Sequence, residues 1–114
     1  MKYKFRAWDT ALNLWIAWEE MMRGDLSYYF SNDRYVMSGF TGIKDCRGVD
    51  IYEHDLIFHY HSNIDLRLSG IVEFKVDWSG FYFAGNRRLN TNTRYEVLGD
   101  QFLNPELIQK EKIT

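Results

Sequence analysis

The sequence predicts a mainly β protein, a bent, coiled or barrel-like antiparallel sheet that ends in a short C-terminal helix. Two observations favour this fold class. Several segments alternate apolar with polar residues, which is typical of strands that bury one face. Tyrosine, phenylalanine and tryptophan, all frequent in strands, make up 18% of the 114 residues, whereas proline occurs once. A chain of this length has room for one core, so we expect a single domain over residues 1–114.

The composition narrows the classes of protein further. Lysine and arginine number 14 and the acidic residues 16, so the net charge of −2 provides no general attraction to nucleic acid or anionic membranes. The lone Cys46 cannot form an internal disulfide. The N-terminus alternates basic and aromatic residues, unlike a signal peptide, and no run of about 18 apolar residues occurs. We therefore expect a cytoplasmic protein that does not contact a membrane.

The first part of the chain predicts four strands. Residues 2–9 alternate basic and aromatic side chains, which indicates a half-buried strand. For Leu14–Trp18 a strand is favoured over a helix capped by Thr10, because tryptophan and isoleucine favour strands and hairpins readily join sequential strands. Leu26–Phe30 and Tyr35–Phe40 are rich in tyrosine and phenylalanine, and the Ser-Asn-Asp turn between them predicts two further strands.

The middle of the chain predicts tight turns followed by a strand. Two glycines and an aspartate indicate the turns within Thr41–Gly48. In the strand that follows, aromatic residues are expected to face the core and both histidines the opposite side. This alternation places Leu56, Phe58 and Tyr60 inside, and Ile57, His59 and His61 outside.

The clearest strand pattern runs from Ile71 to Phe83. Apolar and polar residues alternate as far as Trp78, and Ser79-Gly80 then fits a two-residue hairpin loop. This register places Trp78 opposite Phe81 and Val76 opposite Phe83. The pattern therefore predicts one core-facing surface, made of Val72, Phe74, Val76, Trp78, Phe81 and Phe83.

The C-terminal part predicts a loop, a strand and a helix. Gly85–Thr93 is polar, and Tyr95–Leu98 resumes a strand pattern. Asn104 and Pro105 form a typical helix start, because asparagine can accept from free backbone N–H groups and proline suits the first helical position. The helix is expected to run from Pro105 to about Glu111.

Two histidines are the candidates for metal binding. His59 and His61 lie two residues apart on one strand face, where His54, Asp55 or Asp65 could supply further ligands. Complete metal sites need three or four convergent ligands, so the pair indicates a solvated strand face more than a metal site. We expect no metal and no cofactor.

Catalytic residues are not evident in the sequence. Asp50, Glu53 and Asp55 form an acidic group beside a turn, but no nucleophile or base accompanies them, which favours a structural role. Cys46 lies between opposite charges in a turn, with no base oriented toward it. We therefore expect a protein that is not an enzyme.

An arginine-containing loop supports an alternative function, nucleic-acid binding. Arg87, Arg88 and Arg94 could contact phosphates, while Tyr82 or Tyr28 could stack on bases. A polar connection of this kind is also the ordinary composition of a surface loop. The acidic net charge makes nucleic-acid binding the second choice.

Six short segments, in order along the chain, point to a known family. They read K-F-R-A-W-D at 4–9, T-G-I-K-D at 41–45 before Gly48, I-Y-E-H-D-L-I at 51–57, G-I-V-E-F at 70–74, Y-E-V-L-G at 95–99 and N-P-E-L at 104–107. In these segments the chain resembles the YopX family of phage and prophage proteins over nearly its whole length. Two positions depart from the family pattern: His54 replaces a glycine, which bears on the φ angle of that turn, and Asp100 replaces an asparagine.

The resemblance implies a phage or prophage origin, a small mainly β fold with a coiled or bifurcated sheet, and a place in the cytoplasm of a bacterial host. It implies no established activity. The motif from Thr41 to Leu56 predicts a corner of the scaffold, whose exposed polar side chains could also form a binding surface. These candidates are Lys44, Asp45, Arg47, Glu53 and Asp55.

The excess of aromatic rings without catalytic motifs favours a non-enzymatic accessory protein that binds a host or phage protein. Rings outside the predicted core are the candidates for the contact surface, namely Tyr28, Tyr29, Phe30, Tyr35 and the segment Trp15–Trp18. Because the rings exceed what a core of this size covers, self-association into a homo-oligomer is a further expectation.

Overall fold

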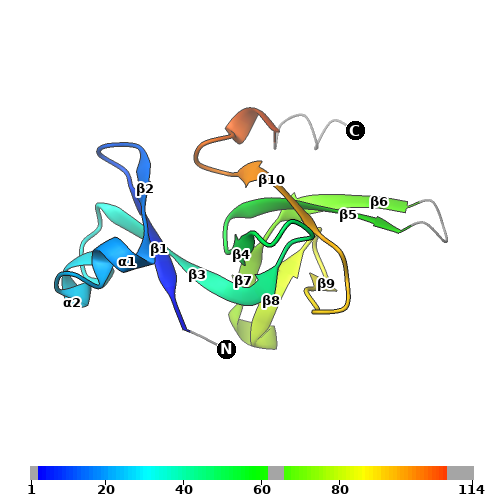
Figure 1. The fold of residues 1–114 in the computed structure, drawn as a ribbon, viewed down its shortest axis with the longest axis horizontal. Helices are drawn as coiled ribbons and strands as arrows, with labels where there is room; N and C mark the ends of the chain where they lie inside the picture. Colours follow the sequence, from blue (N-terminus) through cyan, green and yellow to red (C-terminus); the bar gives the residue numbers. More distant parts are fainter. Residues whose placement is uncertain (1–2, 62–65, 108–114) are drawn as a thin grey trace.

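The computed structural model describes residues 3–61 and 66–107. These residues form a mainly β protein in which the paired strands are antiparallel, which confirms the predicted fold class. The molecule is elongated, with extents of 48 × 31 × 30 Å. Strand β3 (Tyr35–Lys44) links a smaller part, which contains the helices α1 (Trp18–Met21) and α2 (Leu26–Phe30), to a curled half-barrel (Figure 1). None of the described helices has the length and apolarity needed to cross a membrane.

The first sheet has the strand order β2-β1-β3-β4. Its central strand β1 (Phe5–Asp9) pairs with β2 (Leu14–Ile16) on one side and with β3 (Tyr35–Lys44) on the other. β4 (Asp50–Tyr52) completes the sheet beside β3. The predicted second strand is thus confirmed over its first three residues, after which the chain enters the short helix α1 (Trp18–Met21).

Helix α2 (Leu26–Phe30) replaces a predicted strand, so that prediction is wrong. Asp25 caps the helix, because its side chain accepts hydrogen bonds from the backbone N–H and the hydroxyl of Ser27, at 3.0 and 2.7 Å. The aromatic residue at the end of α2 packs against the first sheet. Phe30 meets Phe5 of β1 edge-on, with 5.2 Å between ring centroids. The cap outweighs the strand preference of the rings.

Strand β3 continues to Lys44, although the sequence predicts tight turns from Thr41. Gly42 takes a φ of 85° within this extension, where the pairing with β4 is irregular. The turn itself comes later, and the backbone N–H of Asp45 closes it by donating to the carbonyl of Val49 at 2.7 Å. The tight turn is therefore confirmed only for its second half.

In the second sheet, β5 (Asp55–His61) lies between β10 (Glu96–Asp100) and β6 (Leu66–Ile71). The predicted facing of β5 is confirmed for Leu56, which is buried, but it is wrong for the two residues that follow. Ile57 is fully buried in the core, on the face assigned to the outside, whereas Phe58 is only partly buried. The curled sheet covers both faces of β5 at its start, so alternation does not identify a single buried face.

The predicted orientations of Tyr60 and His61, and the candidate ligand Asp65, concern parts of the chain that lie outside the described side chains.

The third sheet has β8 (Gly80–Phe83) in the middle, between β7 (Glu73–Lys75) and β9 (Arg87–Arg88). The chain passes directly from β6 of the second sheet into β7 of the third, with only Val72 between them. This branching agrees with the bifurcated sheet that the family resemblance implies. The two sheets curl around one core, which contains Ile51, Ile57, Val72, Phe83, Leu89 and Tyr95.

The predicted hairpin register around Ser79 is wrong. Phe74 lies opposite Phe81 in the β7–β8 ladder, and Val76–Trp78 forms the 3₁₀ turn η2 before Ser79 takes a φ of 48°. The connection is therefore longer than two residues, and the residues assigned to one core face separate. Val72 and Phe83 are buried, but Phe74, Val76 and Trp78 are exposed.

The C-terminal helix begins at Pro105, and its described part ends at Leu107, so the rest of the predicted helix lies outside the described residues. Asn104 does not cap this helix as predicted. Its side-chain oxygen accepts from the backbone N–H of Asp100 at 3.1 Å and thereby holds the end of β10. His54 takes a φ of 77°, so the turn retains a positive φ despite the departure from glycine.

Candidate functional site

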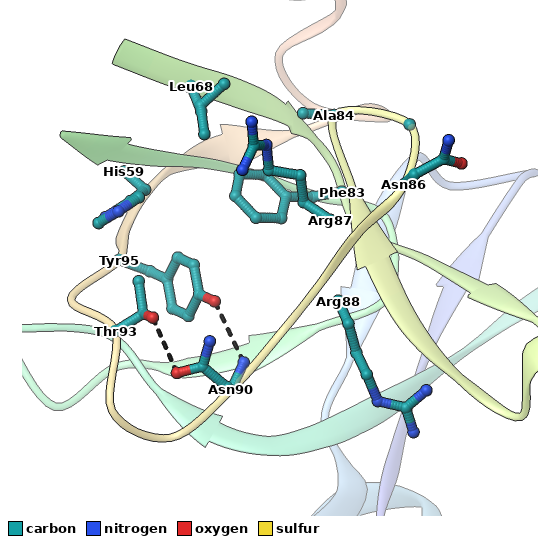
Figure 2. A pocket seen from close by; sticks show the side chains of 11 residues that line it. His59, Leu68, Phe83, Ala84, Asn86, Arg87, Arg88, Asn90, Thr93 and Tyr95 are labelled. Carbon is teal, nitrogen blue, oxygen red and sulfur yellow. Dashed lines mark hydrogen bonds between the residues drawn. The ribbon is translucent and has the colours of Figure 1, made fainter. Parts of the chain in front are cut away.

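A cavity of about 700 Å³ opens between the second and third sheets, beside the loop that follows β8 (Figure 2). Its lining residues come from β5, β6, β8, β9 and the loop before β10. They include His59, Leu68, Phe83, Arg87, Asn90 and Tyr95. A site of this size accommodates a small organic ligand.

Close backbone packing shapes one wall of the cavity. Ala84 and Gly85 take φ angles of 49° and 85°, which reverses the chain between β8 and β9. Gly70 in β6 lies directly against this turn: a Cβ there would stand 2.6 Å from the backbone nitrogen of Ala84. A glycine is needed at this position, because the opposing atom belongs to the backbone and cannot rotate away.

Aromatic rings form the floor of the cavity. Phe83 and Tyr95 meet edge-on, with 5.5 Å between ring centroids. The Tyr95 hydroxyl accepts a hydrogen bond from the backbone N–H of Asn90 at 3.1 Å, as the dashed line in Figure 2 marks. Both rings are almost fully buried. A ligand would therefore meet mainly the polar side chains around the opening.

The three arginines predicted as one nucleic-acid surface point in different directions. Figure 2 shows Arg87 turned over the cavity and Arg88 directed away from it. Arg88 instead donates to the hydroxyl of Tyr82 at 2.8 Å. Arg94 lines a separate, smaller pocket beside Cys46. Adjacent strand residues face opposite sides, so Arg87 and Arg88 separate once they form β9.

His59 reaches the cavity with one ring nitrogen already engaged. Its Nδ1 lies 3.1 Å from the carbonyl oxygen of Arg94, and its ring packs against Tyr95. Within residues 3–61 and 66–107, no three His, Cys, Asp or Glu side chains come together as a group that could hold a metal ion.

The acidic group predicted around β4 is divided between two ion-pair sites. Asp50 pairs with both Lys4 and Lys44, each at 2.6 Å. Asp55 is buried and pairs with Arg6 at 2.6 Å, so the expectation that it is exposed is wrong. Burial raises the pKa of Asp55, an effect that Arg6 opposes. These carboxylates join strands together, which agrees with the structural role favoured from the sequence.

Asp45 is also buried, contrary to the expectation of an exposed binding residue. Its carboxylate accepts from the backbone N–H groups of Arg47, Val49 and Val97, at 2.8, 2.9 and 3.1 Å. Burial alone would raise the pKa of Asp45, but these hydrogen bonds outweigh it and hold the pKa below its ordinary value. Asp45 therefore fastens its turn to β10.

The remaining candidates of this corner differ in exposure. The side chains of Lys44 and Arg47 are exposed, whereas Glu53 is partly buried. Their role in binding stays a prediction.

The three tyrosines predicted for binding form one cluster, Tyr28, Tyr29 and Tyr35, with ring centroids 5.0 to 5.7 Å apart. The hydrogen bond with Tyr28 raises the pKa of Tyr35. The cluster lies at the start of β3, and Lys44 ends the same strand, so the predicted binding residues do not share one surface (Figure 1). Trp15 is partly buried and donates to Asp100 at 3.0 Å.

A second hollow, which we name the apolar groove, was not found from the sequence. It has a volume of about 520 Å³ and lies between the first sheet and β7–β8. Gly39 lines it, and a Cβ at this position would make ordinary van der Waals contacts with the rings of Phe5 and Phe81, at 3.4 and 3.8 Å. The sequence did not predict the groove, because the predicted hairpin register placed Phe74 and Val76, which are exposed and line it, in the core. The main apolar residues of the groove are Tyr3, Phe5, Phe40, Phe74, Val76 and Phe81.

The fold and these sites define a class of protein, a small mainly β domain with a bifurcated, curled sheet that carries a polar cavity and an apolar groove. The chain belongs to the YopX family, since the family model described as "YopX protein" matches residues 22–109. This confirms the family predicted from the sequence motifs.

A solved structure is similar over almost the whole chain. It is the crystal structure of protein EF1440 from Enterococcus faecalis, which has a TM-score of 0.68 and 21% sequence identity. The alignment covers 95% of this chain and 99% of the other. At this identity the similarity shows a shared fold alone. No curated protein matches the sequence.

Proposed function

We propose that this protein is a non-enzymatic phage or prophage accessory protein, which binds an extended apolar segment of a host or phage protein in the bacterial cytoplasm. The apolar groove is the observation that carries the proposal. Family membership supports it, because the YopX resemblance implies a phage or prophage origin.

The groove presents apolar side chains that the fold itself does not cover. Val76 is 78% exposed, Tyr3 85% and Phe74 44%. Covering a side chain of this kind contributes about 1.5–3 kcal/mol in favour of association. Exposed apolar surface gathered in a hollow is typical of a protein-binding site.

The strand beside the groove favours an extended partner. β7 is an edge strand of the third sheet, so one row of its backbone N–H and C=O groups has no strand partner among the described residues. An added strand can pair with such an edge while its apolar side chains enter the groove. Lys4 and Glu53 also line the groove and supply its polar groups.

Two matched variants test the proposal in affinity capture from a bacterial host lysate. Val76→Glu places a charge in the groove, and Leu12→Glu places one at a 62% exposed site in the β1–β2 turn. We expect a partner that binds the wild type and Leu12→Glu but not Val76→Glu. Synthetic peptides from that partner should then bind through an extended apolar segment.

Equal capture by both variants contradicts the proposal, as does a partner that recognises another surface. Light scattering on the same proteins tests the predicted homo-oligomer. Self-association that Val76→Glu abolishes would identify a second copy as the occupant and would overturn the assignment to a host or phage protein.

Nucleic-acid binding, the alternative predicted from the sequence, is not carried further as a function. The side chains of Arg87 and Arg88 point in different directions, and Arg94 lines a separate pocket, so the three do not form a continuous path for a phosphate backbone.

A further inference from the structure

We propose that the cavity beside Arg87 binds the phosphate group of a small organic ligand. This site is separate from the apolar groove, and the inference does not depend on the proposed function. It rests on the charges and hydrogen-bond donors that surround the cavity.

The Arg87 guanidinium over the cavity lacks an acidic partner among the described residues. The side chain of Arg87 has no hydrogen bond or ion pair with any described residue. Arg88 donates to neutral oxygens only, at Tyr82, Trp78 and Ser79. No aspartate or glutamate of the described residues lines the cavity. A local excess of positive charge therefore exists in a chain whose net charge is −2, and such a site attracts an anion.

The arginines elsewhere in the fold show the contrast. Arg6 pairs with the buried Asp55 at 2.6 Å, and Arg34 pairs with the buried Asp9 at 2.8 Å. These two arginines thus have carboxylate partners. Arg87 has none among the described residues, although its side chain lies over a cavity (Figure 2).

Asn90 supplies a second donor whose orientation is fixed. Its side-chain oxygen accepts from the backbone N–H of Asn92 at 3.0 Å and from the hydroxyl of Thr93 at 2.8 Å. The amide NH₂ is thereby directed away from these two groups, and it makes no hydrogen bond to the described residues. Both Asn90 and Arg87 line the cavity.

Phosphate fits these donors better than other ligand chemistry. A guanidinium presents two parallel N–H groups that match two oxygens of a phosphate, and an amide NH₂ can reach a third. The rings of the floor are nearly buried, so the site does not offer an open face for base stacking. Recognition of the phosphate itself is therefore expected, with the attached group occupying the rest of about 700 Å³.

The position of Arg87 is set before any ligand arrives. Phe83 and Arg87 are paired residues of β8 and β9, and the turn between them has positive φ at Ala84 and Gly85. Ligand binding consequently orders a side chain on a fixed backbone, which reduces its entropic cost.

Nuclear magnetic resonance titrations of the complete protein test the site with three probes. These are inorganic phosphate, adenosine monophosphate and single-stranded DNA of about ten nucleotides, at roughly 50 mM salt. We expect saturable shifts of backbone amides in residues 84–95. Arg87→Ala should weaken binding about tenfold or more. Arg23→Ala removes the same charge from an exposed ion pair at the end of α1 and should leave binding unchanged.

The probes also distinguish a small ligand from a nucleic-acid strand. Comparable affinity for adenosine monophosphate and DNA would support a small ligand, whereas a strong preference for DNA that falls steeply with salt would overturn this assignment. The proposal is overturned if none of the probes gives saturable shifts, or if Arg87→Ala and Arg23→Ala weaken binding equally. The amide spectra of the free variants show whether each is folded. Arg87→Lys keeps the positive charge but lacks the two parallel N–H groups of the guanidinium, so it should bind with intermediate affinity.

Discussion

Replacing Arg6 with alanine tests the buried ion pair that joins the first and second sheets. The Arg6 guanidinium lies 2.6 Å from one carboxylate oxygen of Asp55 and stacks over Trp15, with 3.8 Å to the ring centroid. The other carboxylate oxygen accepts from the backbone N–H of Tyr52 at 2.8 Å. Arg6→Ala therefore leaves a buried carboxylate with a single hydrogen bond and no cation.

The expected loss is large for a protein of this size. Removing one member of a buried ion pair costs about 3–5 kcal/mol. Domains have a free energy of unfolding of about 5–15 kcal/mol, so Arg6→Ala removes a substantial fraction of it. Arg23→Ala breaks the exposed pair with Glu20 and should cost less than about 1 kcal/mol. Adding Asp55→Asn to Arg6→Ala removes the unpaired charge, so the double variant should be more stable than Arg6→Ala alone.

Urea unfolding followed by tryptophan fluorescence measures these differences at neutral pH. The pH dependence supplies an independent check. Burial raises the pKa of Asp55 in the folded protein, and without Arg6 the pKa rises further. A raised pKa stabilises the fold at low pH, and that stabilisation is lost as the pH rises through the folded-state value. The deficit of Arg6→Ala should thus shrink in acid. A stabilising role for the Arg6–Asp55 pair is refuted if Arg6→Ala loses no more stability than Arg23→Ala, or if adding Asp55→Asn restores none.

Three further predictions follow from the turns and from a second buried carboxylate. Asp45→Ala should lower the free energy of unfolding by about 3 kcal/mol or more, because three backbone N–H groups lose their acceptor. Thermal unfolding measures this, and a loss below about 1 kcal/mol would contradict it. Gly48→Ala should lower the free energy of unfolding in urea by about 1 kcal/mol, because Gly48 has a φ of 83°. Gly24→Ala should be nearly neutral, because Gly24 has open space around it and no positive φ. Equal effects of the two variants would argue against backbone strain at Gly48. Hydrogen bonds from Arg34 hold the pKa of Asp9 at about 2, so its stabilisation is complete above the ordinary pKa of 3.8 and is lost as pH falls toward 2. Asp9→Asn should remove this part of the acid-unfolding curve, and an unchanged curve would disprove it.

The sequence was sufficient to predict the fold class and several strands, because alternation directly reflects one buried and one exposed face. Residues 2–9 and Tyr95–Leu98 correspond to β1 and β10 within a few residues. Alternation fails where the sheet branches. Val76 follows the pattern of a core strand but begins the 3₁₀ turn η2, and it is Val72 and Phe83 that reach the core. The curl that separates them depends on contacts between distant strands.

The candidate sites were harder to predict than the fold. The sequence identified Asp45 and Asp55 as important polar residues, but their burial depends on partners far along the chain, the N–H of Val97 and the guanidinium of Arg6. The directions of the arginine side chains in the loop after β8 also could not be predicted from the sequence, because they depend on whether that segment forms a strand. Arg87 and Arg88 would share a surface in an irregular loop, whereas in β9 they face opposite sides.

The central position of β1 sets an order of events during synthesis on the ribosome. β2 follows at once, but the Asp55 partner of Arg6 is made 49 residues later, and the Asp100 partner of Trp15 comes 85 residues after the tryptophan. At typical translation rates the second interval lasts roughly 4–17 s. Through that time the N-terminal aromatic rings lack their final cover, so the nascent chain is most prone to aggregate before β10 has emerged.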